Sequence, residues 1–165
     1  MCYDDAMKMT ILCVGKLKEK FYREAVEEYC KRLSRYCKVE IIEVEDERTP
    51  DKASPAAEDQ IRKKEGERLL AKLKPDSCVI TLEILGKKMD SVAFSKLMDR
   101  AFAEGKSHVQ FIIGGSLGLS EAVSERADYK ISFSDMTFPH QLMRVILCEQ
   151  LYRGFRILNK EPYHK

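Results

Sequence analysis

The sequence predicts an α/β fold in which a mainly parallel sheet is sandwiched by helices. Short apolar stretches alternate with segments whose apolar residues recur at helical spacing, an order that requires crossover connections between parallel strands. Residues 78–82 and 109–113 are apolar without alternation, as expected of strands that are buried on both faces. A chain of 165 residues, 44% of them hydrophobic, can bury such a sheet within one domain.

The first half of the chain is predicted to contain two strands, each followed by a helix. Residues 9–15 form a short apolar run, and residues 18–36 then carry apolar side chains at helical spacing. Residues 39–44 predict the second strand. A charged loop then leads to Ser54, a suitable N-cap for a helix that ends before Pro75.

The second half repeats this alternation three times. In chain order, the predicted elements are a strand over residues 78–84, a helix from a cap at Asp90 or Ser91 to Gly105, a strand over 109–113, a short helix over 120–127, a strand over 129–133 and a last helix after Pro139. The last helix is apolar on more than one face. This fits either a central buried helix or a helix that also contacts a second copy of the chain.

A glycine-rich stretch, FIIGGSLGLSE over residues 111–121, follows the fourth predicted strand. Glycine adopts positive φ freely and leaves room for a close approach, so a tight turn and a ligand cradle are both open. In parallel α/β sheets ligands bind beyond the carboxyl ends of the strands, which is where this stretch lies. It contains neither the Rossmann nor the P-loop pattern of glycines.

The same stretch matches the G-x-S-x-G pattern of a serine hydrolase, with Ser116 at its centre. Asp135 and His140 are the candidates for the acid and the base. They are only five residues apart on one predicted loop, which is too cramped for the usual triad. A small hydrolase is therefore the weakest of the function hypotheses.

Composition argues against several other classes of protein. The three histidines share no metal-ligand spacing, so we expect no metal site. The six cysteines form no C-x-x-C pair and are expected to be reduced thiols. No apolar run is long enough to span a membrane, and residues 1–6 do not resemble the start of a signal peptide. We expect a soluble, cytoplasmic protein.

The net charge of +2 is small, but the C-terminal end is predicted to be a basic surface with interleaved aromatic residues. From residue 141 onward its basic and aromatic residues are Arg144, Arg153, Arg156, Lys160, Lys165, Tyr152, Phe155 and Tyr163. Such a surface suits a nucleic-acid partner. Taken alone, the charges are better explained by a solvated helix face.

Six motifs, taken in order, carry a resemblance to a known family. They are TILCVGKLK, VITLEILGK, IIGGSLGLS, TFPHQLMR, EQLYRGFRI and PYHK. The chain resembles the RlmH family of ribosomal RNA large-subunit methyltransferases, which belongs to the SPOUT class. The resemblance implies a single domain over residues 7–165, with residues 1–6 expected to be a tag or a non-native extension.

The resemblance also implies a fold and a cofactor. SPOUT enzymes thread the C-terminal chain into an α/β trefoil knot, whose loops clasp S-adenosylmethionine. Carried over residue by residue, the cofactor-binding residues are Leu82, Gly114, Phe133, Ser134, Asp135, Met136, Thr137 and Phe138. A purely physical interpretation leaves these positions open as core, turn or loop residues.

The family's substrate is a pseudouridine of large-subunit ribosomal RNA, methylated at N3 within the assembled ribosome. Loss of the N3 proton calls for a proton acceptor or for stabilisation of the anion. His140 and Arg144, one helical turn apart, are the catalytic candidates, with Tyr152, Arg153 and His164 approaching the target base. Structural roles remain open: His140 as a helix cap, Arg144 as the partner of Glu149 or another carboxylate.

The resemblance further implies a homodimer in which the C-terminal segment of one copy completes the site of the other. Neither a membrane nor a metal ion is expected among its partners. The alternative from another class is a non-enzymatic dimer that binds ribosomal RNA through the basic C-terminal surface. Only the enzyme would bind S-adenosylmethionine.

Overall fold

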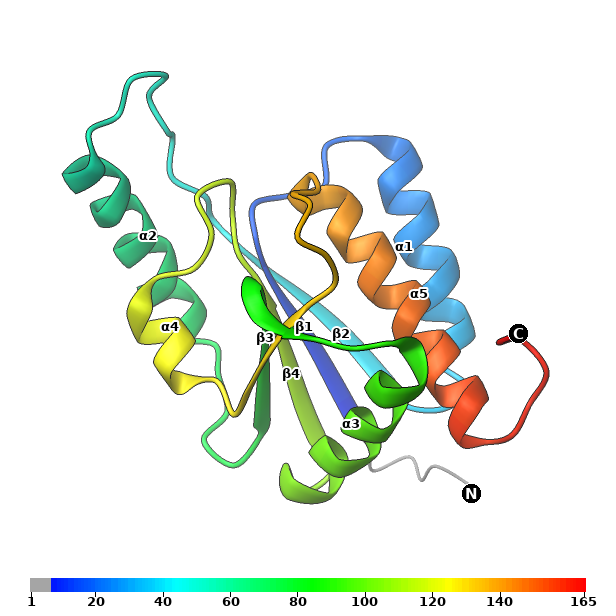
Figure 1. Cartoon of the computed structure of the whole chain (residues 1–165). Helices are drawn as coiled ribbons and strands as arrows, with labels where there is room; N and C mark the ends of the chain where they lie inside the picture. The colour runs from blue at the N-terminus through cyan, green and yellow to red at the C-terminus, as the bar shows by residue number, and fades with distance from the viewer. Residues whose placement is uncertain (1–6) are drawn as a thin grey trace.

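The computed structural model describes residues 7–165, in which a five-stranded, wholly parallel sheet carries helices on both faces (Figure 1). The proposal that residues 1–6 are an extension lies outside the described residues. The elements in chain order are β1 (Lys8–Val14), α1 (Lys20–Leu33), β2 (Lys38–Val44), α2 (Pro55–Leu70), β3 (Cys78–Lys88), α3 (Ser91–Glu104), β4 (His108–Ile113), α4 (Glu121–Arg126), β5 (Tyr129–Ser132) and α5 (His140–Leu158). The predicted fold class and element order are confirmed.

The strand order is β2-β1-β4-β3-β5. Helices α1, α3 and α5 pack together on one face, and α2 and α4 lie on the other (Figure 1). The carboxyl ends of all five strands therefore meet at one edge of the sheet. The threading of a knot stays a prediction, and this strand order is compatible with it.

Two helix starts follow the predicted capping chemistry. The Ser54 hydroxyl accepts a hydrogen bond from the amide of Ala57 at 3.1 Å, and Pro55 occupies the first turn of α2. For α3 the sequence left Asp90 and Ser91 open as the N-cap. The structure shows that Asp90 is the cap, because its carboxylate accepts a hydrogen bond from the amide of Ala93 at 2.7 Å.

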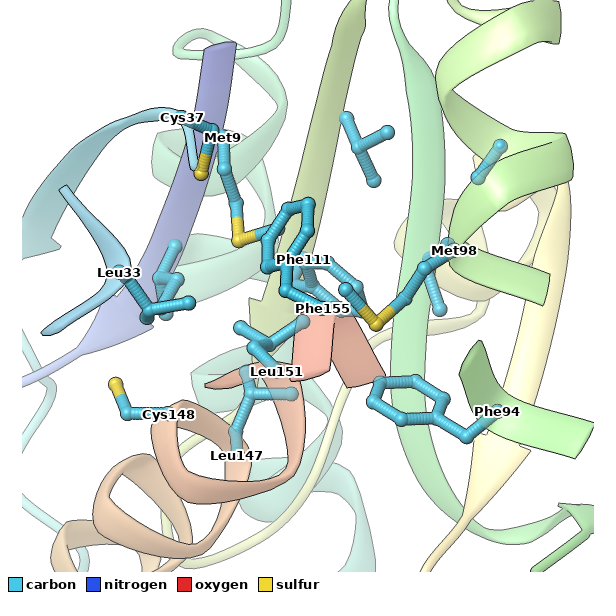
Figure 2. Packing of buried hydrophobic residues seen from close by; sticks show 14 of the residues in the cluster. Met9, Leu33, Cys37, Phe94, Met98, Phe111, Leu147, Cys148, Leu151 and Phe155 are labelled. Carbon is cyan, nitrogen blue, oxygen red and sulfur yellow. The ribbon is translucent and has the colours of Figure 1, made fainter. Parts of the chain in front are cut away.

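Strand β1 shows how the sheet is buried on both faces. Ile11 and Cys13 pack into a large cluster beneath α1, α3 and α5, whereas Leu12 and Val14 pack into a smaller cluster beneath α2 and α4. Figure 2 shows the larger cluster around Phe111 and α5. The prediction of strands buried on both faces is confirmed.

Helix α5 is the central helix of its layer, since it packs against both α1 and α3. Its residues Leu147, Cys148, Leu151 and Phe155 are fully buried (Figure 2). The prediction of a basic, aromatic C-terminal surface was therefore wrong for Phe155 and for Arg144, which is 1% exposed. Helical periodicity alone did not reveal that α5 is covered by helices on two sides.

Strand β3 departs from the prediction at its carboxyl end, where it continues to Lys88 instead of ending near residue 84. Leu82 and Lys87 are both in register with Ile131 of β5, so the four residues between them leave the ladder as a bulge. The ladder resumes at Lys87, directly after Gly86, where a Cβ would lie 2.6 Å from the carbonyl carbon of Ile131. Leu85 in the bulge is 99% exposed.

The five cysteines among the described residues, Cys13, Cys30, Cys37, Cys78 and Cys148, are free, as predicted. Burial raises the pKa of the Cys13 thiol and of the Cys37 thiol to about 12. These two thiols are therefore uncharged core side chains at neutral pH.

Candidate active site

A pocket of about 680 Å³ opens at the edge of the sheet where β3, β4 and β5 end. The segments that follow β4 and β5 lie side by side there, next to the β3 bulge and the start of α5 (Figure 1). Its lining residues are Leu82, Glu83, Ile84, Leu85, Ile113, Gly114, Gly115, Ser116, Gly118, Leu119, Ile131, Ser132, Phe133, Ser134, Met136, Thr137, Phe138, Pro139, His140 and Met143. The location is the one expected for a ligand in a parallel α/β sheet.

The glycine-rich stretch forms a tight turn and also lines this pocket. Gly118 has φ of +82°, and its amide donates to the carbonyl of Gly115 at 3.1 Å. A Cβ at Gly114 would lie 2.9 Å from the carbonyl carbon of Gly118. The interpretations as turn and as cradle, both left open by the sequence, therefore describe the same residues.

The segment between β5 and α5 supplies the opposite wall. The Ser132 hydroxyl donates to the carbonyl of Ser134 at 3.0 Å, and the Ser134 hydroxyl accepts from the amide of Met136 at 3.0 Å. These local bonds hold the segment in shape without a helix or strand. Phe133 and Phe138 place aromatic rings in the same wall.

Seven of the eight residues expected to bind the cofactor line the pocket, namely Leu82, Gly114, Phe133, Ser134, Met136, Thr137 and Phe138. The eighth, Asp135, does not. Its side chain is 78% exposed and pairs with Lys88.

His140 occupies the first turn of α5 and lines the pocket. It is not the helix cap, since Pro139 precedes the helix and no side chain caps it. Burial, and secondarily the positive charge of Arg144, lower the pKa of His140 below its usual value, whereas Asp46 opposes this shift. The imidazole is therefore neutral at neutral pH and can accept a proton.

Arg144, one turn further along α5, is a buried structural link rather than a pocket side chain. Its Nη1 donates to Glu43 Oε2 at 2.6 Å, and its Nη2 donates to the carbonyl oxygens of Gly15 at 2.6 Å and Val14 at 3.3 Å. The sequence left open Glu149 or another carboxylate as the partner of Arg144, and the structure shows Glu43 in that role. Arg144 thus ties α5 to the carboxyl ends of β1 and β2.

Tyr152, Arg153 and His164 gather at the other end of α5. Arg153 donates to Glu149 at 2.6 Å and lies 3.3 Å from Nδ1 of His164. The Tyr152 ring contacts the Tyr163 ring with centroids 4.9 Å apart. Tyr152 follows His140 by twelve residues, which is about 18 Å along a helix. Within one chain, these residues are not brought to the pocket.

The serine hydrolase arrangement is not assembled. Ser116 and His140 both line the pocket, but among the hydrogen bonds of residues 7–165 none joins them. Asp135, the candidate acid, is turned away toward Lys88.

Residue-level reasoning missed part of the lining, most notably Glu83, Ile84 and Leu85 of the β3 bulge and Met143 of α5. The bulge had one sequence signal, Gly86 inside an otherwise apolar strand pattern. Met143 lies one turn after His140 and so shares its face of the helix.

In the part of the chain that the structure describes, no three His, Cys, Asp or Glu side chains are grouped so as to hold a metal ion. Among the same residues, no helix is both long and apolar enough to cross a bilayer.

Comparison with known proteins gives consistent results. A family model described as "Predicted SPOUT methyltransferase" matches residues 7–164. The chain is 56% identical to the ribosomal RNA large subunit methyltransferase H of Clostridium kluyveri and 53% identical to that of Acetivibrio thermocellus. Both alignments span 159 residues, 96% of this chain and 100% of the relative.

A solved structure supports the fold. A probable methylase family protein from Haemophilus influenzae superposes with a TM-score of 0.54 at 10% sequence identity, covering 98% of this chain and 71% of that protein.

Proposed function

The chain belongs to the SPOUT methyltransferase family, and from this premise we propose that it methylates large-subunit ribosomal RNA, with the pocket at the carboxyl ends of β3, β4 and β5 as its S-adenosylmethionine site. The main observation behind the proposal is that a neutral histidine, His140, lies in the wall of that pocket. A relative 56% identical over its whole length bears the rRNA methyltransferase name.

The residues of the pocket fit an adenosine-containing ligand. Its volume of about 680 Å³ lies in the usual range for small-molecule sites. Phe133, Phe138 and Leu119 offer apolar surface to a purine, and the bare backbone at Gly114 and Gly115 allows close approach of polar atoms. When bound, S-adenosylmethionine supplies an activated methyl group on a sulfonium, so the chemistry requires alignment and exclusion of water.

The target atom is N3 of a pseudouridine, by the resemblance to the RlmH family. His140 accepts the N3 proton, because it stands in the pocket wall and burial keeps its imidazole unprotonated. Arg144 is a positioning residue. Its hydrogen bonds fix the first turns of α5 against Gly15 and Glu43, and this sets where His140 stands.

The working form is a homodimer. Tyr152 lies about 18 Å along the helix from His140 in its own chain, and Arg153 and His164 gather beside it, so a second copy is needed to bring these residues to the pocket. Half-buried Leu142, Val145 and Ile146 on α5 provide apolar surface for that contact. The substrate is the ribosome, whose shape supplies recognition that this single domain lacks, and its location is the cytoplasm.

The proposal is tested with ribosomes from a strain that lacks the gene. Purified protein and S-adenosylmethionine are added to those ribosomes and, in parallel, to deproteinised rRNA, and the nucleosides are analysed by mass spectrometry. We expect one methylated pseudouridine to appear in the ribosome sample and little or none with free rRNA. A methyl group on another nucleoside, or none, would refute the substrate assignment.

A further inference from the structure

Among residues 7–165, Glu83 is the one carboxylate that lines the pocket, and no lysine or arginine of this part of the chain lines it. The residue follows Leu82 at the point where β3 leaves its ladder with β5. Its neighbours in the wall, Ile84, Ile113 and Leu119, are apolar. A charged acceptor held among apolar side chains is a specific polar feature of the kind that fixes the orientation of a ligand.

The carboxylate of Glu83 is held in place by two hydroxyl groups. Thr81 Oγ1 donates to Oε2 at 2.5 Å. The Ser124 hydroxyl of α4 lies 2.8 Å from Oε1 and 3.1 Å from Oε2, so its single proton is shared between the two oxygens. These contacts tie the carboxylate to a fully buried residue of β3 and to the neighbouring helix.

A count of acceptor sites shows unused capacity. An ionised carboxylate offers about four lone-pair sites. Thr81 and Ser124 together donate two protons. About two acceptor sites therefore remain, which is the number that a vicinal diol can fill.

The position of Glu83 indicates which part of the cofactor it meets. Thr81 is in register with Ile112, so Glu83 lies opposite Gly114 in the continuation of β3 and β4. Its partner Ser124 belongs to α4, on the opposite face of the sheet from α5, which carries His140. Glu83 and the reactive end of the pocket are thus on different walls.

The lining also separates the adenosine half of the cofactor from its amino-acid half. Among residues 7–165 no lysine or arginine lines the pocket, so within one copy the α-carboxylate of the cofactor has no cationic partner there and is best left in water. Its ammonium group, on the same carbon, stays in water with it. Of the remaining donors, the adenine amino group and the ribose hydroxyls, only the vicinal hydroxyls present two donors side by side to one carboxylate.

We propose that Glu83 accepts hydrogen bonds from the 2′- and 3′-hydroxyls of the ribose of S-adenosylmethionine and so selects ribonucleoside ligands over deoxyribonucleosides. The proposal rests on the pocket being the cofactor site. An acid beyond a strand end plays the same chemical role toward ribose in dinucleotide-binding sheets.

The test is calorimetry of the full-length chain with S-adenosylmethionine, with 5′-methylthioadenosine, which lacks the amino-acid part, and with 2′-deoxy-5′-methylthioadenosine. We expect the wild-type protein to bind the ribo form about 10- to 100-fold more tightly than the deoxy form, as for a hydrogen bond to a charged group. In Glu83→Ala we expect S-adenosylmethionine and 5′-methylthioadenosine to weaken by the same factor. The ribo and deoxy forms should then bind nearly equally.

Glu125→Ala is the matched control, because Glu125 is an exposed carboxylate next to Ser124 that does not line the pocket. It should leave all three affinities unchanged. If Glu83→Ala weakens the ribo and deoxy forms equally, Glu83 only shapes the wall and the inference is wrong. A loss confined to S-adenosylmethionine would assign Glu83 to the ammonium group and also overturn it. Absence of any binding by the wild-type protein would instead refute the proposed function.

Discussion

The two ends of α5 carry the same residue types in opposite settings. At the start of the helix His140 lines the pocket and Arg144 is 1% exposed, with bonds to Glu43 and to two strand-end carbonyls. At the far end Arg153 donates to Glu149 and contacts His164 of the C-terminal segment near the surface. In the sequence analysis, the His140–Arg144 pair and the Arg153–His164 pair were both catalytic candidates. Their surroundings show that an arginine can fix a helix in one place and remain available to a partner in the other.

The largest effect expected from a change at either end of α5 is the loss of methyl transfer when His140 is replaced. Replacing His140 by Gln removes the proton acceptor, and we expect the rate of methyl transfer to fall by about 10²- to 10⁴-fold. The affinity for S-adenosylmethionine, measured by calorimetry, should change little. A rate within a few-fold of wild type would show that the proton leaves by another route.

The pH dependence of the methyl-transfer rate gives a second test of His140 as the proton acceptor. Burial and Arg144 lower the pKa of His140, so its neutral, proton-accepting form persists below the pH at which a free histidine is half protonated. The single-turnover rate should therefore be level above about pH 6.5 and should fall only at lower pH. Lys18 adds to the lowering and Asp46 opposes it. A rate that rises steeply above pH 8 would point to a different acceptor.

The next largest effect is on stability and separates the two arginines. Arg144→Ala removes the charged donor from Glu43, which keeps the amide of Leu17, and from two backbone carbonyls, and we expect the free energy of unfolding to fall by about 3 kcal/mol. Arg153→Ala removes a partly exposed pair on one helix face and should cost less than about 1 kcal/mol. Urea unfolding of both variants measures the contrast. Equal losses would mean that Arg144 is not the link described.

The smallest effect concerns two neighbours in the loop before α5. Phe138→Ala removes apolar surface from the pocket wall and should weaken S-adenosylmethionine binding by about 10-fold. Asp135→Asn alters a side chain that faces Lys88 and solvent, so the affinity should stay within about 2-fold of wild type. A larger loss in the Asp135 variant would place that carboxylate in the pocket after all.

The sequence predicted most of the fold, because strand burial, helix capping and alternation are local properties. Capping by Ser54 and the nearly continuous apolar run of β4 each depend on a few neighbouring residues. Seven of the eight cofactor candidates, which the family resemblance supplied, line the pocket, and residues just beyond adjacent strand ends meet at one edge in such a sheet.

The misses depend on contacts between residues that are far apart in the chain. Arg144 is buried because Glu43, 101 positions earlier, lies beside it. The β3 bulge arises from two residues of one strand sharing the partner Ile131, and no spacing within residues 78–88 encodes that. Glu83 therefore stayed hidden until the pocket brought β3, α4 and the glycine-rich turn together.

The central claim is that the start of α5 in one copy works with the end of α5 in another. Two variants, His140→Gln and the double variant Arg153→Ala with His164→Ala, each damage one of these ends and are expected to be nearly inactive alone. When the two proteins are mixed and allowed to exchange, random pairing should restore about a quarter of wild-type methyl transfer, because half of the dimers then contain one intact site. Activity that stays at the level of the separate variants, under conditions where exchange is shown to occur, would contradict the shared site.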